Sequence, residues 1–339
     1  MVKPEILFLQ QEDVIAAGAL DMKKVLAMVE KAFYLQGKGE ISNPPKTMIN
    51  VPNDENWQSR FISMPVYIGS EFNRPGVKWA AESQANMKTG DLPMGIDIVI
   101  LSDPVTVLPV AIMDGTLITA MRTAAAAGVA AKYLAPKGTE VVGCVGAGVI
   151  GRTMIMALKE VLPNLQQIRL CDLRIEKAET IAAEFAGEVE IIPTNSVEEA
   201  VTGADVIATM TTSRKPFVKE KWVKLGALVI QMSSYEVEAA VLAKADKKVV
   251  DNWAQMKENE ASVFLQLAQE GVITEADVVE LKDIVVGNKP GRVTDDELIM
   301  FGSRGMGCLD IMVANYIYHS AQEKGIGQKL ALWDEAKWL

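Results

Sequence analysis

Two patterns of apolar residues divide the chain. From Ser59 to Asp114, short apolar runs alternate with turn-rich pieces, which predicts an antiparallel meander of strands. A strand over Ile6–Leu9 precedes them, followed by a helix that Asp21 caps and whose apolar residues recur on one face. An alanine-rich helix over Leu117–Leu134 follows the meander.

From Glu140 onward, strands and helices alternate, which predicts a Rossmann-type doubly wound parallel sheet of about six strands. Within it, Ser196 and Glu199 predict a capping box at the start of a short helix. A last helix, about Asp310 to Glu323, falls outside the alternation, and we expect it to pack on the first domain. The predicted fold class is therefore α/β, with a Rossmann domain (123–306) and a discontinuous α+β domain (1–122 and 307–339).

Composition narrows the possible chemistry. The net charge of −10 opposes binding to nucleic acid or to an anionic membrane. The single histidine, His319, excludes a multi-histidine metal site and argues against a Ser-His-Asp triad, so we expect no metal. Three widely spaced cysteines suggest no disulfide framework. With neither a signal peptide nor a membrane helix expected, we predict a soluble cytoplasmic protein.

A glycine-rich loop carries the main cofactor signal. A G-x-G-x-x-G motif closes a predicted strand and opens a predicted helix, and Asp172 ends the next strand 21 residues after the motif. The glycines permit a tight turn and close approach of a pyrophosphate to the N-terminus of the helix. We assign the whole motif to cofactor binding: Gly146, Ala147, Gly148, Val149, Ile150 and Gly151.

The residues around this loop bear on the choice of cofactor. Asp172 suits the ribose hydroxyls of NAD and repels a 2′-phosphate, whereas Arg174 beside it suits NADP, so NAD is favoured with NADP left open. Thr209, Met210 and Thr211 follow another strand at its carboxyl end, where doubly wound folds bind ligands, and are assigned to a cofactor wall.

Two cations stand in apolar surroundings. Lys78 lies within a predicted strand and Arg122 within the otherwise uncharged start of a helix. Because an unpaired buried charge is costly, such residues are usually paired or face a ligand, and here they suit an anionic substrate. The alternatives are that Lys78 extends to solvent from an edge strand and that Arg122 forms a structural ion pair.

Several motifs together resemble the ornithine cyclodeaminase/mu-crystallin family. They are Pro44-Pro45-Lys46-Thr47, Ser63-Met64-Pro65, Gly76-Val77-Lys78, Met113-Asp114-Gly115, Thr119-x-x-Arg122-Thr123-Ala124-Ala125, the glycine loop and Lys289-Pro290-Gly291-Arg292. The resemblance implies a homodimer formed through the first domain and an active site facing the nicotinamide. It implies that Lys46, Lys78 and Arg122 gather the α-carboxylate of the substrate, with Lys46 in place of the usual arginine. Thr123 is assigned to cofactor binding.

The resemblance also implies a reaction at the Cα–N bond of a small amino acid. NAD⁺ takes hydride from Cα to give an imine, and in a cyclodeaminase a side-chain amine then attacks, ammonia leaves and the hydride returns. Other members interconvert amino acids with their imino or keto forms, and some resemble mu-crystallin and bind NADPH. The three hypotheses are therefore an amino-acid or imine oxidoreductase, a true ornithine cyclodeaminase, and a cofactor-binding protein without turnover.

One departure from the family pattern concerns the proton carrier. After the strand at 227–232, cyclodeaminases have an acid/base aspartate, whereas this chain has Tyr235 and Glu236. Either is a candidate acid or base; alternatively Glu236 is a solvated helix-start residue and Tyr235 a packing aromatic. Asp310 matches a family aspartate before the last helix, which predicts contact with cofactor or active-site water, or else a helix N-cap. The departure favours amine or imine oxidoreduction over cyclodeamination.

Overall fold

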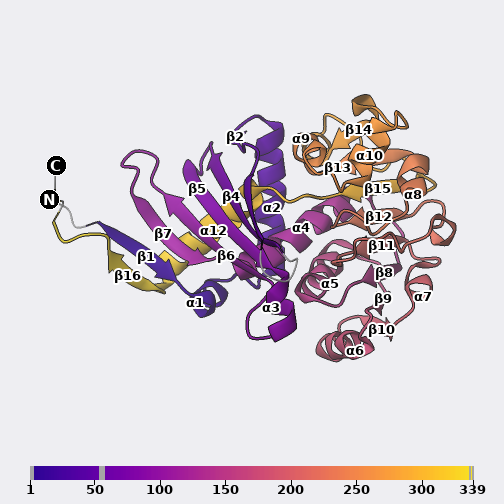
Figure 1. Ribbon diagram of the computed structural model, residues 1–339, viewed down its shortest axis with the longest axis horizontal. Helices are drawn as coiled ribbons and strands as arrows, with labels where there is room; N and C mark the ends of the chain where they lie inside the picture. The colour runs from indigo at the N-terminus through magenta and orange to yellow at the C-terminus, as the bar shows by residue number, and fades with distance from the viewer. Residues whose placement is uncertain (1–3, 53–57, 336, 338–339) are drawn as a thin grey trace. The chain divides into compact units, whose positions relative to one another are not determined.

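The structure is a computed structural model that describes residues 4–52, 58–335 and 337, and it divides into two compact units (Figure 1). The first comprises Met1–Arg122 and Met306–Leu339, and the second comprises Thr123–Gly305. Within the described residues, each unit is built around one eight-stranded sheet. The predicted fold class, a Rossmann-type parallel sheet plus a separate α+β part, is confirmed.

The first sheet is antiparallel except where β1 pairs parallel with β7. Its strands, in spatial order, are β16 (Gln328–Ala331), β1 (Glu5–Leu9), β7 (Pro109–Asp114), β6 (Gly95–Ser102), β5 (Arg74–Ser83), β4 (Gln58–Ile68) and β2 (Ile41–Ser42), with β3 (Thr47–Pro52) also paired to β4. The order β4–β5–β6–β7 is the meander that the apolar runs predicted.

The two faces of this sheet differ in what covers them. Side chains alternate along each strand, so Lys78 on β5 is buried whereas its neighbour Trp79 is 42% exposed. The buried face packs on α12 (Gly307–Lys324), which contacts β4, β5, β6 and α2 (Met22–Gly37). In α2, Asp21 accepts a hydrogen bond from the Lys24 N–H at 3.0 Å, as the predicted cap requires.

The other helices of the first unit are short, apart from α4, which continues into the second unit. They are α1 (Gln11–Ala16), α3 (Gln84–Thr89) and α4 (Thr116–Leu134). The last helix of the unit, α12, begins three residues before the predicted Asp310, with Met306 in the N-cap position. Asp310 therefore lies in the first turn and is not the N-cap.

The second sheet is parallel throughout. Its strands, in spatial order, are β10 (Glu190–Thr194), β9 (Gln167–Cys171), β8 (Val141–Val145), β11 (Val206–Thr209), β12 (Leu228–Gln231), β15 (Ile299–Gly302), β13 (Lys247–Val250) and β14 (Val278–Glu280). The chain order reverses between β8 and β11, which is where such sheets bind ligands. All four residues of β11 and of β12 are buried, as expected for strands covered on both faces.

Short helices connect these strands: α5 (Val149–Val161), α6 (Ile175–Glu184), α7 (Val197–Val201), α8 (Ala239–Lys244), α9 (Trp253–Lys257), α10 (Val263–Gln269), α11 (Leu281–Val285) and the 3₁₀ turns η1 (Glu220–Trp222) and η2 (Glu275–Asp277). The predicted capping box at α7 is half correct. Ser196 Oγ accepts from the Glu199 N–H at 3.2 Å, but the Glu199 carboxylate instead accepts from Thr194 Oγ1. The helices of the described residues are either too short or too polar to cross a bilayer.

Candidate functional site

A cluster of buried charges lies on the covered face of the first sheet. Lys78 Nζ is 2.7 Å from Thr119 Oγ1 and 3.1 Å from both Asp310 Oδ1 and Asp97 Oδ2. Arg122 Nε donates to Asp310 Oδ1 at 3.0 Å. The four charged side chains are between 0% and 8% exposed. We call these residues, Lys78, Asp97, Thr119, Arg122 and Asp310, the charge cluster.

The cluster brings together four elements that are far apart in the chain. Lys78 comes from β5, Asp97 from β6, Thr119 and Arg122 from successive turns of α4, and Asp310 from the first turn of α12. Because β5 lies between β4 and β6, Lys78 does not extend to solvent from an edge strand. Arg122 forms an ion pair, as its alternative interpretation predicted. Its partner is Asp310, which is itself a predicted site residue.

Asp310 is the carboxylate that both cations share. Burial alone raises the pKa of its carboxyl, but the charges of Arg122 and Lys78 outweigh this and hold the pKa below its ordinary value. Asp310 is therefore ionised at neutral pH. Its second oxygen, Oδ2, is buried and has no hydrogen-bond partner among the residues that the structure describes. A buried oxygen in this state calls for an explanation, and a ligand is one of the few that apply.

Lys46 immediately precedes β3. The pairing of β3 with β4 ends at Thr47 and Ser63, and Met64, the next residue of β4, pairs with Lys78 on β5. The preceding loop is held at the start of α12, where the Cys308 N–H donates to Asn43 Oδ1 at 3.1 Å. Lys46 is half-buried.

In the second unit, the glycine motif forms the turn between β8 and α5. Gly146 has φ of +116°, and a Cβ there would lie 2.6 Å from the Met210 carbonyl oxygen. A Cβ on Gly151 would lie 2.0 Å from the Gly146 carbonyl oxygen, whereas one on Gly148, the N-cap, would meet nothing within 4 Å. The loop is closed on its protein side and open at the helix N-terminus, so it fits a pyrophosphate.

Asp172 holds this loop from the end of β9. Its Oδ2 accepts from the Ala147 N–H at 2.8 Å and its Oδ1 from the Arg174 N–H at 2.9 Å. Each oxygen retains a lone pair for a ribose hydroxyl. The Arg174 side chain is exposed.

Glu236 has a setting that the sequence does not indicate. It is fully buried, so it is not a solvated helix-start residue. Its carboxylate accepts from Thr209 Oγ1 at 2.7 Å, from the Ser233 N–H at 3.2 Å and from the Thr211 N–H. Burial raises its pKa, although these hydrogen bonds oppose the rise. Glu236 thus ties together the loops after β11 and β12.

Tyr235, by contrast, is 39% exposed and lies in the loop after β12. The predicted cofactor-wall residues Thr209, Met210 and Thr211 lie at the end of the adjacent strand β11, and Thr209 is fully buried. Thr123 follows Arg122 in α4, where the division into units falls.

Asp97 and Thr119 are the cluster residues that the sequence reasoning missed. Along β6, residues 97, 99 and 101 are buried and their neighbours less so. An aspartate at an inward position of a strand with this alternation is a signal for a buried charge. Thr119 was quoted only as part of a motif, and its hydroxyl contacts Lys78, Asp97 and Asp310.

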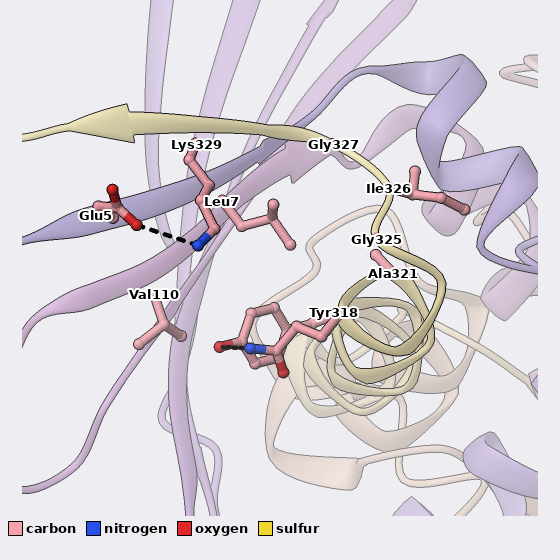
Figure 2. A pocket seen from close by; sticks show the side chains of 10 residues that line it. Glu5, Leu7, Val110, Tyr318, Ala321, Gly325, Ile326, Gly327 and Lys329 are labelled. Atoms are coloured by element: carbon pink, nitrogen blue, oxygen red, sulfur yellow. Dashed lines mark hydrogen bonds and ion pairs between the residues drawn. The ribbon is translucent and has the colours of Figure 1, made fainter.

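A separate cavity of about 550 Å³ lies at the other end of α12 (Figure 2). Leu7 and Val110 form part of its wall. Its polar groups satisfy one another: Lys329 pairs with Glu5 at 3.2 Å, and Gln322 donates to the Tyr318 hydroxyl at 2.8 Å. It contains none of the predicted site residues. The candidate functional regions are therefore the charge cluster in the first unit and the glycine loop in the second.

The model of the ornithine cyclodeaminase/mu-crystallin family matches residues 5–325. The chain belongs to this family. An N-((2S)-2-amino-2-carboxyethyl)-L-glutamate dehydrogenase of Staphylococcus aureus is 32% identical over 334 residues, which is 97% of this chain and 99% of that protein.

Two solved structures are also similar. A Delta(1)-pyrroline-2-carboxylate reductase of Thermococcus litoralis, in complex with NADH and L-proline, is 33% identical with a TM-score of 0.87, covering 96% of this chain and 100% of that one. An archaeal alanine dehydrogenase dimer with bound NAD is 31% identical with a TM-score of 0.87, covering 97% and 100%. The resemblance inferred from the motifs is confirmed.

Proposed function

We propose that this protein is an NAD-dependent enzyme that oxidises a small α-amino acid at its Cα–N bond or reduces the corresponding imine. The observation that carries the proposal is the charge cluster, in which two buried cations converge on Asp310. The relatives support it, since they are dehydrogenases and reductases of amino acids and imines.

The glycine loop and Asp172 would hold the cofactor, with Thr123 and the Thr209–Thr211 segment contributing to its site. NAD, when bound, supplies the hydride acceptor. The two structural relatives with bound NADH and NAD favour NAD over NADP. Glu236 contributes indirectly, because it fixes the backbone of Thr211 and Ser233 on neighbouring loops.

In this proposal Arg122, Lys78 and Lys46 bind the α-carboxylate, and Asp310 orients the two buried cations. Tyr235 is the proposed acid or base, since the residue is 39% exposed whereas the Glu236 carboxylate is enclosed by donors. A phenol in this role replaces the aspartate that the cyclodeaminase pattern has after the same strand.

The test is an assay of the wild-type protein against the common L-amino acids with NAD⁺, recording absorbance at 340 nm and ammonia together. We expect NADH to form with at least one amino acid in proportion to the product. Ammonia with only catalytic NAD⁺ and no net NADH would identify a cyclodeaminase instead. Tight NADH binding with no turnover in either direction, imines included, would contradict the proposal and favour a cofactor-binding protein.

We further propose that the protein is a homodimer formed through the open face of the first sheet. That face carries exposed apolar side chains in neighbouring strands: Ile49, Tyr67, Trp79, Ile96 and Ile98. Successive side chains of a strand point to opposite faces, so Trp79 points away from the face that buries its neighbour Lys78. Ile98 pairs with Trp79 and therefore lies on the same open face. Apolar groups this numerous on an open sheet face mark an interaction site.

Substituting Ile98→Lys is expected to convert the dimer into a monomer, since each interface then buries two unpaired charges related by symmetry. Light scattering after size-exclusion chromatography measures the mass. The matched control is Leu225→Lys, in the turn before β12 of the second unit, where the side chain is 83% exposed, and it should stay dimeric. A wild-type protein that is monomeric at micromolar concentration contradicts the proposal.

A further inference from the structure

The charge cluster, which does not include the half-buried Lys46, is electrically neutral before any substrate binds. Its two cations, Lys78 and Arg122, are balanced by two carboxylates, Asp97 and Asp310, and all four are nearly or fully buried. Asp97 decides this balance, because with Asp310 alone the cluster would carry one net positive charge. Asp97 is also next to Lys78 on the covered face, since Lys78 pairs with Val99 and Asp97 lies two residues along β6.

Asp97 also forms an ion pair with Lys78, at 3.1 Å. An ammonium group has three N–H bonds, and Nζ is surrounded by three protein oxygens, from Thr119, Asp310 and Asp97. A carboxylate that approaches Lys78 therefore meets the negative charge of Asp97. In a buried, weakly screened setting this repulsion disfavours a ligand that brings negative charge alone.

The cluster has a spare acceptor as well. Asp310 Oδ2 is buried without a hydrogen-bond partner in the described part of the chain. A ligand with a protonated nitrogen beside its carboxylate supplies an N–H to such an oxygen and adds no net charge to the cluster. A 2-oxo or 2-hydroxy acid adds one negative charge and lacks the nitrogen.

We propose that Asp97 is a specificity-determining residue that makes the buried cluster neutral, so that the site favours zwitterionic amino acids and iminium acids over 2-oxo and 2-hydroxy acids. The inference rests on the proposed function in one respect, which is that the cluster binds the substrate's carboxylate. It goes beyond it by naming the residue that sets the charge of the ligand.

The test compares two small ligands of similar size and different charge, pyruvate and L-alanine. Each is titrated by calorimetry into the full-length protein saturated with NADH, where neither reacts in the absence of ammonia. Asp97→Asn keeps the side chain's size and an oxygen for Lys78 but gives the cluster a net charge of +1. We expect pyruvate to bind Asp97→Asn at least tenfold more tightly than wild type, with no such gain for L-alanine.

Three further variants separate charge from structural damage. Asp97→Ser gives the cluster the same net charge with a smaller side chain and should show the same gain in pyruvate affinity. The test can use either variant, provided that its melting temperature matches that of the wild type. Lys78→Gln combined with Asp97→Asn restores neutrality and should lose the gain. Asp103→Asn removes a half-buried charge just beyond the far end of β6, roughly 20 Å along the strand, and should change neither affinity.

A folded Asp97→Asn or Asp97→Ser protein that binds pyruvate no more tightly than wild type overturns the inference. So does an equal gain for both ligands, because it shows general loosening of the site. Failure of the proposed function is recognised separately, by the absence of amino-acid turnover in the wild-type assay, which does not involve Asp97 variants.

Discussion

Arg122→Ala is expected to lower kcat/KM for the amino-acid substrate at least a hundredfold while leaving NAD binding unchanged. The guanidinium is a planar donor that suits a carboxylate, and its Nε holds Asp310 Oδ1 at 3.0 Å. Its removal takes away a substrate contact and leaves Asp310 with Lys78 as its one remaining charged partner in the described structure. Steady-state kinetics and a fluorescence titration with NADH measure the two effects.

The same variant should unfold at a higher pH than wild type when the solution is acidified. In the wild type, the pKa of Asp310 is lower in the folded protein than in the unfolded chain. Its ionised form therefore contributes stability above the ordinary aspartate pKa, and that contribution is lost as the pH falls toward the folded pKa. Without Arg122 the folded pKa rises, so less stability remains at any pH above it.

Arg60→Ala is the matched control for Arg122. Arg60 pairs with Glu82 at 2.7 Å on the surface, where both side chains are about two-fifths exposed. Such pairs contribute at most about 1 kcal/mol, so activity and acid stability should stay near wild type. An Arg122→Ala protein that keeps more than a tenth of the wild-type kcat/KM would show that the cluster is structural only.

Gly151→Ala is expected to abolish measurable NAD binding and to lower the melting temperature. The new Cβ would lie 2.0 Å from the Gly146 carbonyl oxygen, and because both groups belong to one tight turn, the loop has to open. Opening displaces the N–H groups at the start of α5 that a pyrophosphate requires. Calorimetric titration with NAD⁺ and thermal melting give the two readouts.

The control for this variant is Gly138→Ala, in the turn before β8. A Cβ on Gly138 meets nothing within 4 Å, so NAD affinity and melting temperature should match wild type. Gly148→Ala separates folding from binding. Its Cβ also meets no protein atom within 4 Å, so the protein should fold normally. Its NAD affinity should fall, because the new methyl group occupies space that the bound pyrophosphate needs. Unchanged NAD affinity in Gly151→Ala would refute the role assigned to the loop.

The features that the sequence predicted well are local ones. The glycine loop is a contiguous motif between a strand and a helix, and Lys78 and Arg122 stand out because a charge in an apolar run needs a partner. The meander and the alternation of strands and helices follow from periodicity. In each case the signal lies within about 30 residues of chain, as in a βαβ unit.

The features that the sequence left open depend on which distant segments meet. Asp97 is one of 44 acidic residues, and its pairing with Lys78 becomes visible only when β5 and β6 are in register. The burial of Glu236 depends on Thr209 and Thr211, which follow a different strand. Asp310 matched a family position, but its partners on β5 and α4 are about 190 or more residues away.

The split of the first unit between the two ends of the chain has a consequence for biosynthesis. Asp310 and the rest of α12 complete both the covered face of the first sheet and the charge cluster, yet they leave the ribosome only after the whole of the second unit. The second unit is one continuous segment and can fold as soon as it emerges. Until α12 has emerged, the covered face of β4, β5 and β6 does not have this helix to pack against, and Lys78 and Asp97 remain in contact with water. The interval between synthesis of the first 122 residues and synthesis of α12 is therefore one in which the nascent chain exposes an apolar sheet face and needs protection from aggregation.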